Sequence, residues 1–219
     1  MSSNPGTSMP AETTLLVASL IDAGTAAIRA NADALGELDR AIGDGDHGVN
    51  MVRGFSAIAE AREAIRALPL SSALEEMGKL LVMNVGGASG PLYGSLLLAM
   101  GRAAAGGNAS AGKMLEEGIA AVKKRGRSDR GEKTMLDVLI PVQLALAQAC
   151  AEGVAVRDAI ERVKRAAREG LESTRPLLAT KGRASYLRER SIGHLDPGAC
   201  SSSLLVHAAC DAFLESTKP

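Results

Sequence analysis

The chain has 219 residues, of which 46% are hydrophobic, and its 25 Lys and Arg residues balance its 25 Asp and Glu residues. A chain of this size and apolar content can bury the core of one ordinary domain, which excludes global disorder. The lack of a basic excess disfavours a nucleic-acid binder, and a content of 2 Tyr, 2 Phe and no Trp leaves few surfaces for stacked bases. We therefore expect a globular protein with no nucleic-acid partner.

The N-terminal segment MSSNPGTSMPAETT has neither the basic nor the apolar region of a signal peptide. It predicts a mobile tail over residues 1–12, followed by a single helical domain over residues 13–219. No stretch approaches the roughly 18 apolar residues of a membrane span. The cysteines are odd in number and lack metal-ligand spacing, which predicts small buried thiols in a reducing compartment. These are Cys150, Cys200 and Cys210. We therefore expect a cytoplasmic protein with no membrane partner.

Helix-forming residues dominate and few segments alternate with period two, so the fold class predicted is all-α. Punctuating residues divide the chain: a break near Gly24, a capping box from Ser72 to Glu75, a helix start at Pro91 and a kink at Pro141. The eight predicted helical segments are roughly 13–40, 49–66, 72–85, 91–106, 110–125, 133–150, 156–178 and 201–215.

The connections between these segments are of two kinds that alternate along the chain. Those after the second, fourth and sixth segments are short and plain: ALPLS, GGNA and AEGVA. Those after the first, third, fifth and seventh are rich in glycine or charge: AIGDGDHG, GGASGP, RGRSDRGEKT and TKGRASYLRERSIGHLDPGAC. In an antiparallel up-and-down arrangement, alternate connections lie at the same end. We therefore expect the four unusual loops to converge on one functional end.

The first unusual loop carries Asp44 and Asp46 between glycines that allow both carboxylates to turn inward, and Asp39 precedes it. Two carboxylates about 4 Å apart repel by roughly 4 kcal/mol at an effective dielectric near 20, so three of them need cations or protons. Oxygen ligands favour magnesium. An EF-hand is excluded because its twelfth position is Phe55, and zinc is disfavoured because His47 is the only nitrogen ligand. A solvated turn that caps the next helix is the alternative.

The second loop, VGGASGPLYG, is a glycine-rich turn that leads into a helix N-terminus. Such a turn directs unpaired N–H groups at an anion. It lacks the GK[ST] ending of a Walker A loop. A close-packed helix–turn–helix is the alternative interpretation.

The third loop offers Gly126, Lys133 and a second capping box, Thr134 with Asp137, and most of its charge is predicted to be solvated surface. The fourth loop is basic, which suits a phosphate held from both sides if it lies opposite the acidic loop. Its cations are Lys181, Arg183, Arg188 and Arg190. Loops beyond about 12–15 residues are usually functional or disordered, which weakens the alternative of a flexible surface loop.

Four strings, LDRAIGDGDHGVNMVRGF, GGASGPLYG, GEKTMLDV and KGRASYLRERSIGHLDPGA, resemble in order and spacing the nucleotide-binding L subunit of dihydroxyacetone kinase. They also resemble the matching domain of the ATP-dependent single-chain kinases, and the likeness covers roughly residues 14–213. The resemblance implies an eight-helix antiparallel barrel. Two positions depart from the pattern: Glu132, where aspartate is expected, and Arg188, where glycine is frequent.

The resemblance also implies a binding site for two Mg²⁺ ions and ADP or ATP. The implied metal ligands are Asp39, Asp44 and Asp46. The implied nucleotide contacts are His47, Gly48, Val49, Asn50, Ala88, Ser89, Gly126, Met135, Arg183, Asp196, Pro197 and Gly198. No nucleophile is implied, and Arg183 is the candidate for stabilising phosphate charge.

The activity implied is that of a kinase subunit, which transfers the γ-phosphoryl group to dihydroxyacetone or a similar short ketose held on a separate K subunit. The donor is either ATP or bound ADP that a phosphotransferase-system subunit rephosphorylates. The sequence leaves open the donor, the ketose, the permanence of bound ADP and the oligomeric state, with a homodimer as one option. Two alternatives are a nucleotide-sensing partner of a transcription factor and a two-metal phosphohydrolase that acts alone.

Overall fold

The computed structural model describes residues 11–107 and 110–217, and within these ranges the chain is helical with no strand. The prediction of an all-α fold is therefore confirmed. The elements are α1 (Ala11–Ala30), α2 (Ala32–Ile42), α3 (His47–Glu60), α4 (Arg62–Arg66), α5 (Leu70–Asn84), α6 (Ser89–Ala104), α7 (Ala111–Gly126), α8 (Leu136–Glu152), α9 (Val156–Ser173), the 3₁₀ helix η1 (Arg183–Ser191) and α10 (Pro197–Ser216). The predicted tail falls outside the described residues, except for Ala11 and Glu12, which begin α1.

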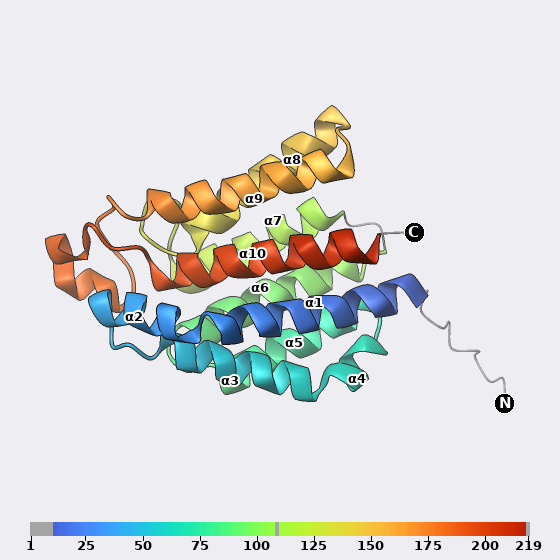
Figure 1. Ribbon diagram of the computed structural model, residues 1–219, viewed down its shortest axis with the longest axis horizontal. Coiled ribbons are helices and arrows are strands. Elements are labelled where there is room, and N and C mark those ends of the chain that lie inside the picture. The colour runs from blue at the N-terminus through green and yellow to red at the C-terminus, as the bar shows by residue number, and fades with distance from the viewer. Residues whose placement is uncertain (1–10, 108–109, 218–219) are drawn as a thin grey trace.

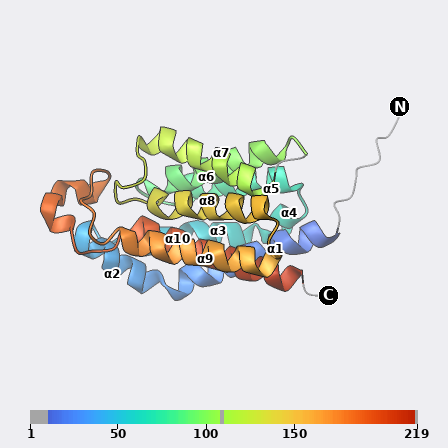
Figure 2. The same ribbon diagram turned by 90° about the horizontal axis from the view of Figure 1, so that it is seen from above.

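The long helices close into a ring in which each packs against the next. Helix α1 packs against α3, α3 against α5, and the series continues through α6, α7, α8, α9 and α10 back to α1. Neighbouring helices in this ring lie side by side along the long axis of the molecule (Figures 1 and 2). The first predicted segment corresponds to α1 with α2 and the second to α3 with α4, so the eight predicted segments correspond to the eight helices of the ring. The eight-helix antiparallel barrel is therefore confirmed.

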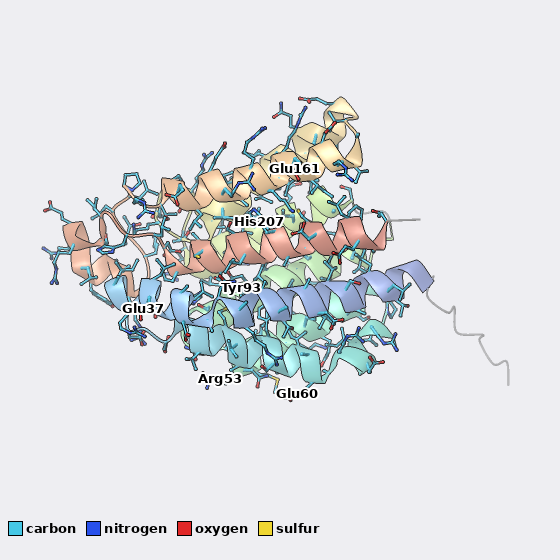
Figure 3. The ribbon with its side chains drawn as sticks, viewed as in Figure 1. Glu37, Arg53, Glu60, Tyr93, Glu161 and His207 are labelled. Atoms are coloured by element: carbon cyan, nitrogen blue, oxygen red, sulfur yellow. The ribbon has the colours of Figure 1, made fainter. Side chains whose placement is uncertain are left out.

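Amphipathic spacing explains why each helix turns one face inward. In α9, Ile160, Val163, Ala167 and Gly170 are buried at intervals of three and four residues, and charged residues fill the other face. Burial of one large apolar side chain contributes about 1.5–3 kcal/mol. Figure 3 shows Glu161 directed outward, whereas Tyr93, which is 3% exposed, lies between the helices. The barrel therefore has a packed apolar interior along most of its length.

The break in the first predicted helix lies at Asn31 and not near Gly24. Helices α1 and α2 meet there at a bend of 57°, and the Asn31 side-chain amide donates to the Ala27 carbonyl at 2.8 Å. Gly24 lies inside α1. A Cβ at this position would lie 3.2 Å from the Phe55 ring, so the absence of a side chain leaves room for that ring. The prediction confused a glycine needed for packing with one that ends a helix.

The capping box predicted from Ser72 to Glu75 is wrong, because α5 begins earlier. Pro69, whose ψ of 146° is extended, precedes the first helical residue, Leu70, and no side chain caps this end. Of the two hydrogen bonds of the capping box predicted at Thr134, one forms and the other goes to a different backbone N–H. The Asp137 carboxylate accepts from the Thr134 N–H at 2.8 Å, but the Thr134 hydroxyl accepts from Leu136 N at 3.2 Å.

Helix α8 begins at Leu136, later than the predicted start at Lys133. Lys133 has a φ of 61°, a left-handed conformation that cannot continue into a helix. The seventh predicted helix ends at Ser173, and the residues after it form the loop that contains η1, which the sequence did not predict. Within η1, Arg188 has a φ of 51°, in the region that favours glycine.

The cysteine prediction is wrong for Cys150, which is exposed, while Cys200 and Cys210 are partly buried. No single helix in the part of the chain described is long and apolar enough to cross a membrane. One bent pair, Thr14–Ala30 with Ala32–Ile42, passes that test of length and composition jointly.

We predict that Gly48→Ala destabilises the fold. A Cβ at Gly48 would lie 2.0 Å from the Ala32 carbonyl oxygen, where α3 begins against the start of α2. Overpacking of this kind typically costs about 1–3 kcal/mol. Chemical denaturation measures the loss. Gly112→Ala is the control, because its Cβ would meet only the Ser110 hydroxyl at 3.8 Å, and it should leave stability unchanged or raised.

Candidate functional site

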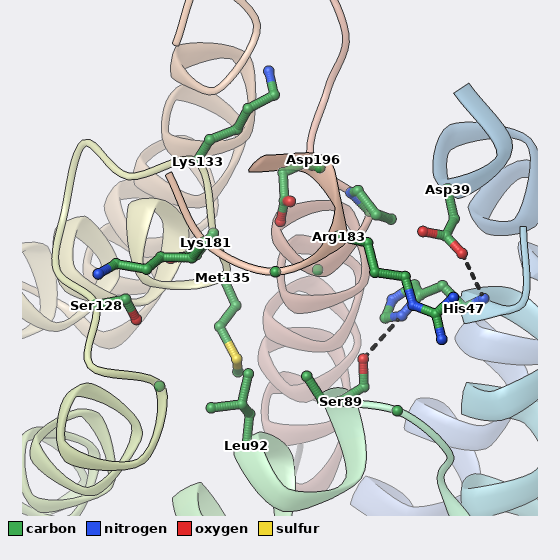
Figure 4. A pocket seen from close by; sticks show the side chains of 18 of the residues that line it. Asp39, His47, Ser89, Leu92, Ser128, Lys133, Met135, Lys181, Arg183 and Asp196 are labelled. Atoms are coloured by element: carbon green, nitrogen blue, oxygen red, sulfur yellow. Dashed lines mark hydrogen bonds between the residues drawn. The ribbon is translucent and has the colours of Figure 1, made fainter. Parts of the chain in front are cut away.

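The four unusual loops meet at one end of the barrel and enclose a cavity of about 720 Å³. Figure 4 shows this cavity, with Asp39 and His47 on one side, Lys181 and Ser128 on another, and Asp196 between them. The α2–α3 connection, the α5–α6 turn, the α7–α8 loop and the segment from α9 to α10 all contribute lining residues. The prediction that these loops converge is therefore confirmed.

Most of the residues predicted for the site line this cavity. They are Asp39, Asp44, Asp46, His47, Ala88, Ser89, Gly126, Met135, Arg183, Asp196, Pro197 and Gly198. Three predicted contacts do not line it. Gly48 is buried against α2, the Val49 side chain is 70% exposed, and Asn50 is buried and accepts a hydrogen bond from the Arg53 side chain. Whether any of these residues binds a nucleotide stays a prediction.

Asp39 organises the acidic loop. Its Oδ2 accepts from the backbone N–H of Asp46 at 2.9 Å and of His47 at 3.1 Å, and its side chain is largely buried. Asp46 occupies the N-cap position of α3 without a side-chain capping bond. Asp39 therefore satisfies the N–H groups at the start of α3, which draws the loop back toward α2.

The carboxylates of Asp39, Asp44 and Asp46 form a compact acidic group. One oxygen from each lies within 4.8 Å of the others, and among the described residues this is the group able to hold a metal ion. Arg183 forms an ion pair with Asp44, in which Nη1 lies 2.5 Å from Oδ2. One guanidinium against three carboxylates leaves excess negative charge. These oxygen donors fit a hard divalent cation such as Mg²⁺.

The positive N-terminal ends of four helices lie around this acidic group. Helices α3, α6, α8 and α10 all begin at the cavity end because the helices of the barrel alternate in direction. The N-terminus of a helix carries roughly half a positive charge and unpaired N–H groups. Gly87, with a φ of 64°, turns the chain into α6, and Pro197 stands at the first turn of α10. The cavity can therefore hold an anion beside a cation.

A largely buried network of hydrogen bonds joins the helices that begin at the cavity. His47 joins Ser89 through Nδ1 at 3.1 Å and Ser201 through Nε2 at 2.9 Å. The Tyr93 hydroxyl lies 2.8 Å from the Ser201 hydroxyl and 2.7 Å from that of Ser202. Burial lowers the pKa of His47, although Asp39 and Asp46 oppose that effect. A neutral imidazole therefore links the starts of α3, α6 and α10.

Burial also changes the chemistry of Asp196, at the start of α10. Its carboxylate accepts from Ala199 N at 2.7 Å and caps the helix. Burial raises the pKa of Asp196 to about 7, with smaller contributions from Asp137 and Asp39, while the Ala199 N–H and Lys133 oppose the rise. Asp196 therefore binds a proton more readily than an exposed aspartate does.

Sequence reasoning missed several residues that shape the site. Lys133 received no role in the predicted site, yet it is 1% exposed. Tyr93 lay inside the GGASGPLYG string, and Ser201 opens a run of three consecutive serines, all of them buried, in an otherwise largely apolar helix. That polar run was the signal available in the sequence.

The fold and the site together define a class of protein: a closed helical barrel with a group of three carboxylates and several helix N-termini around one end. A family model, the DAK2 domain, matches residues 41–211. The chain belongs to this family.

Two relatives are similar over most of their length. A protein of Listeria innocua named "PEP-dependent dihydroxyacetone kinase 1, ADP-binding subunit DhaL" is 47% identical over 184 residues, which cover 83% of this chain and 87% of the relative. An Escherichia coli protein named "PEP-dependent dihydroxyacetone kinase, ADP-binding subunit DhaL" is 44% identical over 171 residues, 75% of this chain and 80% of the relative.

Solved structures agree in fold. The dihydroxyacetone kinase of C. freundii in its native form is 25% identical with a TM-score of 0.71, and the match covers 96% of this chain but 38% of that longer one. The structure of that kinase in complex with AMP-PNP and Mg²⁺ has a TM-score of 0.70 at 24% identity, covers 96% and 37% of the two chains, and supports the fold alone.

We predict that Tyr93→Phe destabilises the protein by about 1–3 kcal/mol, because it leaves the buried Ser202 hydroxyl without its partner. Thermal or chemical denaturation measures this loss. Tyr186→Phe is the matched control, since that tyrosine is 85% exposed and should tolerate the change. Equal stability of the two variants would contradict a role for the Tyr93 hydroxyl.

The pKa of Asp196 predicts a pH dependence of stability. The folded-state pKa of about 7 exceeds the usual 3.8, so the folded state binds more protons between these values. Its contribution to stability is then complete below about pH 4 and is lost as the pH rises through 7. In metal-free and nucleotide-free buffer, the Tm of the wild type minus that of Asp196→Asn should fall from pH 5 to pH 8. A difference that is constant with pH would refute this prediction.

Proposed function

We propose that this chain is the ADP-binding subunit of a dihydroxyacetone kinase and works with a separate K-type subunit that carries the ketose. Relatives that bear the name of the ADP-binding subunit are 47% and 44% identical, and the matches span 87% and 80% of their lengths. The observation that carries the proposal is the group of three carboxylates beside the converging helix N-termini. This combination suits a nucleotide phosphate tail bound together with its metal ions.

The carboxylates of Asp39, Asp44 and Asp46 would hold the metal, which we propose to be two Mg²⁺ ions. Their oxygens lie within 4.8 Å of one another, which is close enough for ions to share ligands. When bound, magnesium neutralises phosphate charge and orients the tail. Asp39 has the additional task of fixing the loop through its two backbone hydrogen bonds.

The phosphates would lie between the acidic group and the helix N-termini. Ala88 and Ser89 present the first turn of α6, and Gly198 presents that of α10. The Arg183 side chain is 62% exposed at the cavity mouth, where it can reach the terminal phosphate. A guanidinium at that position stabilises charge on the transferring group.

The base would occupy the apolar part of the cavity. Leu92, Val122 and Met135 line it, and the Met135 side chain lies against Leu92 (Figure 4). Gly126 lies beside them, and a Cβ at this position would come 3.2 Å from Leu92 Cδ2. A flat aromatic base suits a pocket of this composition.

In the proposed reaction, the bond between the β–γ bridging oxygen and the γ-phosphorus breaks, and a new bond forms to a substrate hydroxyl oxygen, whose proton leaves. The chain supplies no nucleophile; it positions the phosphates and stabilises their charge. The acceptor is dihydroxyacetone or a similar short ketose on the K-type partner. The names of the two relatives call their kinases PEP-dependent. By analogy, a phosphocarrier that draws on phosphoenolpyruvate would rephosphorylate ADP.

Calorimetric titration with ADP in magnesium buffer tests this function. The wild type should bind with micromolar or better affinity, and Asp44→Asn should weaken binding at least tenfold, about 1.4 kcal/mol. Asp158→Asn, at the exposed start of α9, should bind as the wild type does. Wild-type protein that neither carries ADP after purification nor binds it in the titration refutes the proposal.

A kinase assay with a K-type partner, dihydroxyacetone and each candidate donor in turn, ATP or a phosphocarrier that draws on phosphoenolpyruvate, then tests the activity. Turnover that requires both chains supports a kinase subunit. Nucleotide binding without turnover would favour the nucleotide-sensing alternative, and phosphate release from ATP by this chain alone would favour a hydrolase.

A further inference from the structure

Two adjacent residues of the α7–α8 loop, Glu132 and Lys133, hold the long segment between α9 and α10 at two separate places. We infer that this Glu132–Lys133 clasp positions Arg183 over the acidic group, and thereby sets nucleotide affinity without contact between Glu132 and the nucleotide. The inference rests on the proposed function and assigns positioning residues to it. Neither residue belongs to the predicted metal or nucleotide contacts.

Lys133 joins the two ends of the segment between α9 and α10. Its ammonium donates to the carbonyl of Thr174 at 2.6 Å and to that of His194, one from each end of the segment. A fully buried lysine is costly unless its hydrogen bonds are satisfied, and burial lowers the pKa of Lys133. The two carbonyls satisfy the ammonium and keep the ends of the segment together.

Further hydrogen bonds join the same two ends. Gly193 N donates to the Arg175 carbonyl at 2.8 Å, and Asp196 N donates to the Thr174 hydroxyl at 3.1 Å. These hydrogen bonds fix the two ends of the segment to each other.

Glu132 holds the middle, close to Arg183 in the chain. Its Oε1 accepts from the Thr180 hydroxyl at 3.0 Å and lies 3.3 Å from Lys181 Nζ. Its Oε2 accepts from Asp129 N at 2.7 Å, which fixes the carboxylate to its own loop. The Glu132 and Lys181 side chains are 28% and 35% exposed, so their pair is more sheltered than a typical surface ion pair.

The position of Arg183 depends on this contact. Arg183 follows Gly182, where the chain turns with a φ of 62°. The Arg183 side chain forms an ion pair with Asp44 but is itself 62% exposed. An exposed ion pair alone contributes little to holding a loop. The Glu132 carboxylate reaches both Thr180 and Lys181, the residues that come shortly before Arg183 in the chain. The clasp therefore limits how far Arg183 can move from the acidic group.

A double-mutant cycle on ADP affinity tests whether Glu132 acts through Arg183. In magnesium buffer, Glu132→Ala should weaken ADP binding about three- to tenfold in the wild-type background. In the Arg183→Ala background it should have no further effect, because the side chain that it positions is gone. A purely structural role would lower affinity by the same factor in both backgrounds.

Glu152→Ala is the matched control. It also removes a carboxylate from a partly exposed ion pair, with Arg162, at the opposite end of the barrel. The control should bind ADP as the wild type does. Equal affinities for Glu132→Ala and Glu152→Ala, or factors that multiply across the cycle, overturn the inference.

Limited digestion with trypsin, without nucleotide, measures the clasp independently of the proposed function. Lys181, Arg183, Arg188 and Arg190 supply cleavage sites in the segment. Glu132→Ala should be cleaved there at least threefold faster than wild type or Glu152→Ala, well below the Tm of each. Equal rates overturn the clasp even if ADP binds, whereas a wild type that does not bind ADP refutes the proposed function and leaves the digestion result to decide the clasp.

Discussion

The direction of the helices is the constraint on which the site depends. An antiparallel ring of eight helices places the starts of α3, α6, α8 and α10 at one end, so four positive helix ends face one cavity. Negative charge is stabilised there, and Asp39 shows how the protein uses this at the start of α3. The same arrangement that closes the barrel thus prepares its end for anions.

The acidic group adds the opposite requirement. Three carboxylates so close together repel one another, and the single ion pair with Arg183 leaves most of that repulsion in place. A bound cation would remove the repulsion, and a phosphate tail would then join the cation to the helix ends. Nucleotide and metal binding should therefore be coupled, and occupancy of the open end should stabilise the fold.

Predictions from the sequence succeeded where the signal was local and failed where it depended on a distant neighbour. The Gly-Asp-Gly-Asp pattern and helical spacing identified the acidic loop and the walls of the barrel. Gly24 and Ser72 misled because their roles depend on Phe55 and on an earlier start at Leu70. Lys133 was left without a role because its burial depends on the carbonyls of Thr174 and His194, which lie far from it in the chain.

The sequence by itself determined the helical class, the alternation of plain and functional loops, and the residue types that can hold metal and phosphate, because these follow from local periodicity and side-chain chemistry. Only the tertiary structure decided that His47 meets Ser89 and Ser201, that Arg183 reaches Asp44, and that Glu132 holds Thr180. Those contacts join residues far apart in the chain. They exist because the packing of the closed barrel brings four separate loops to the same end.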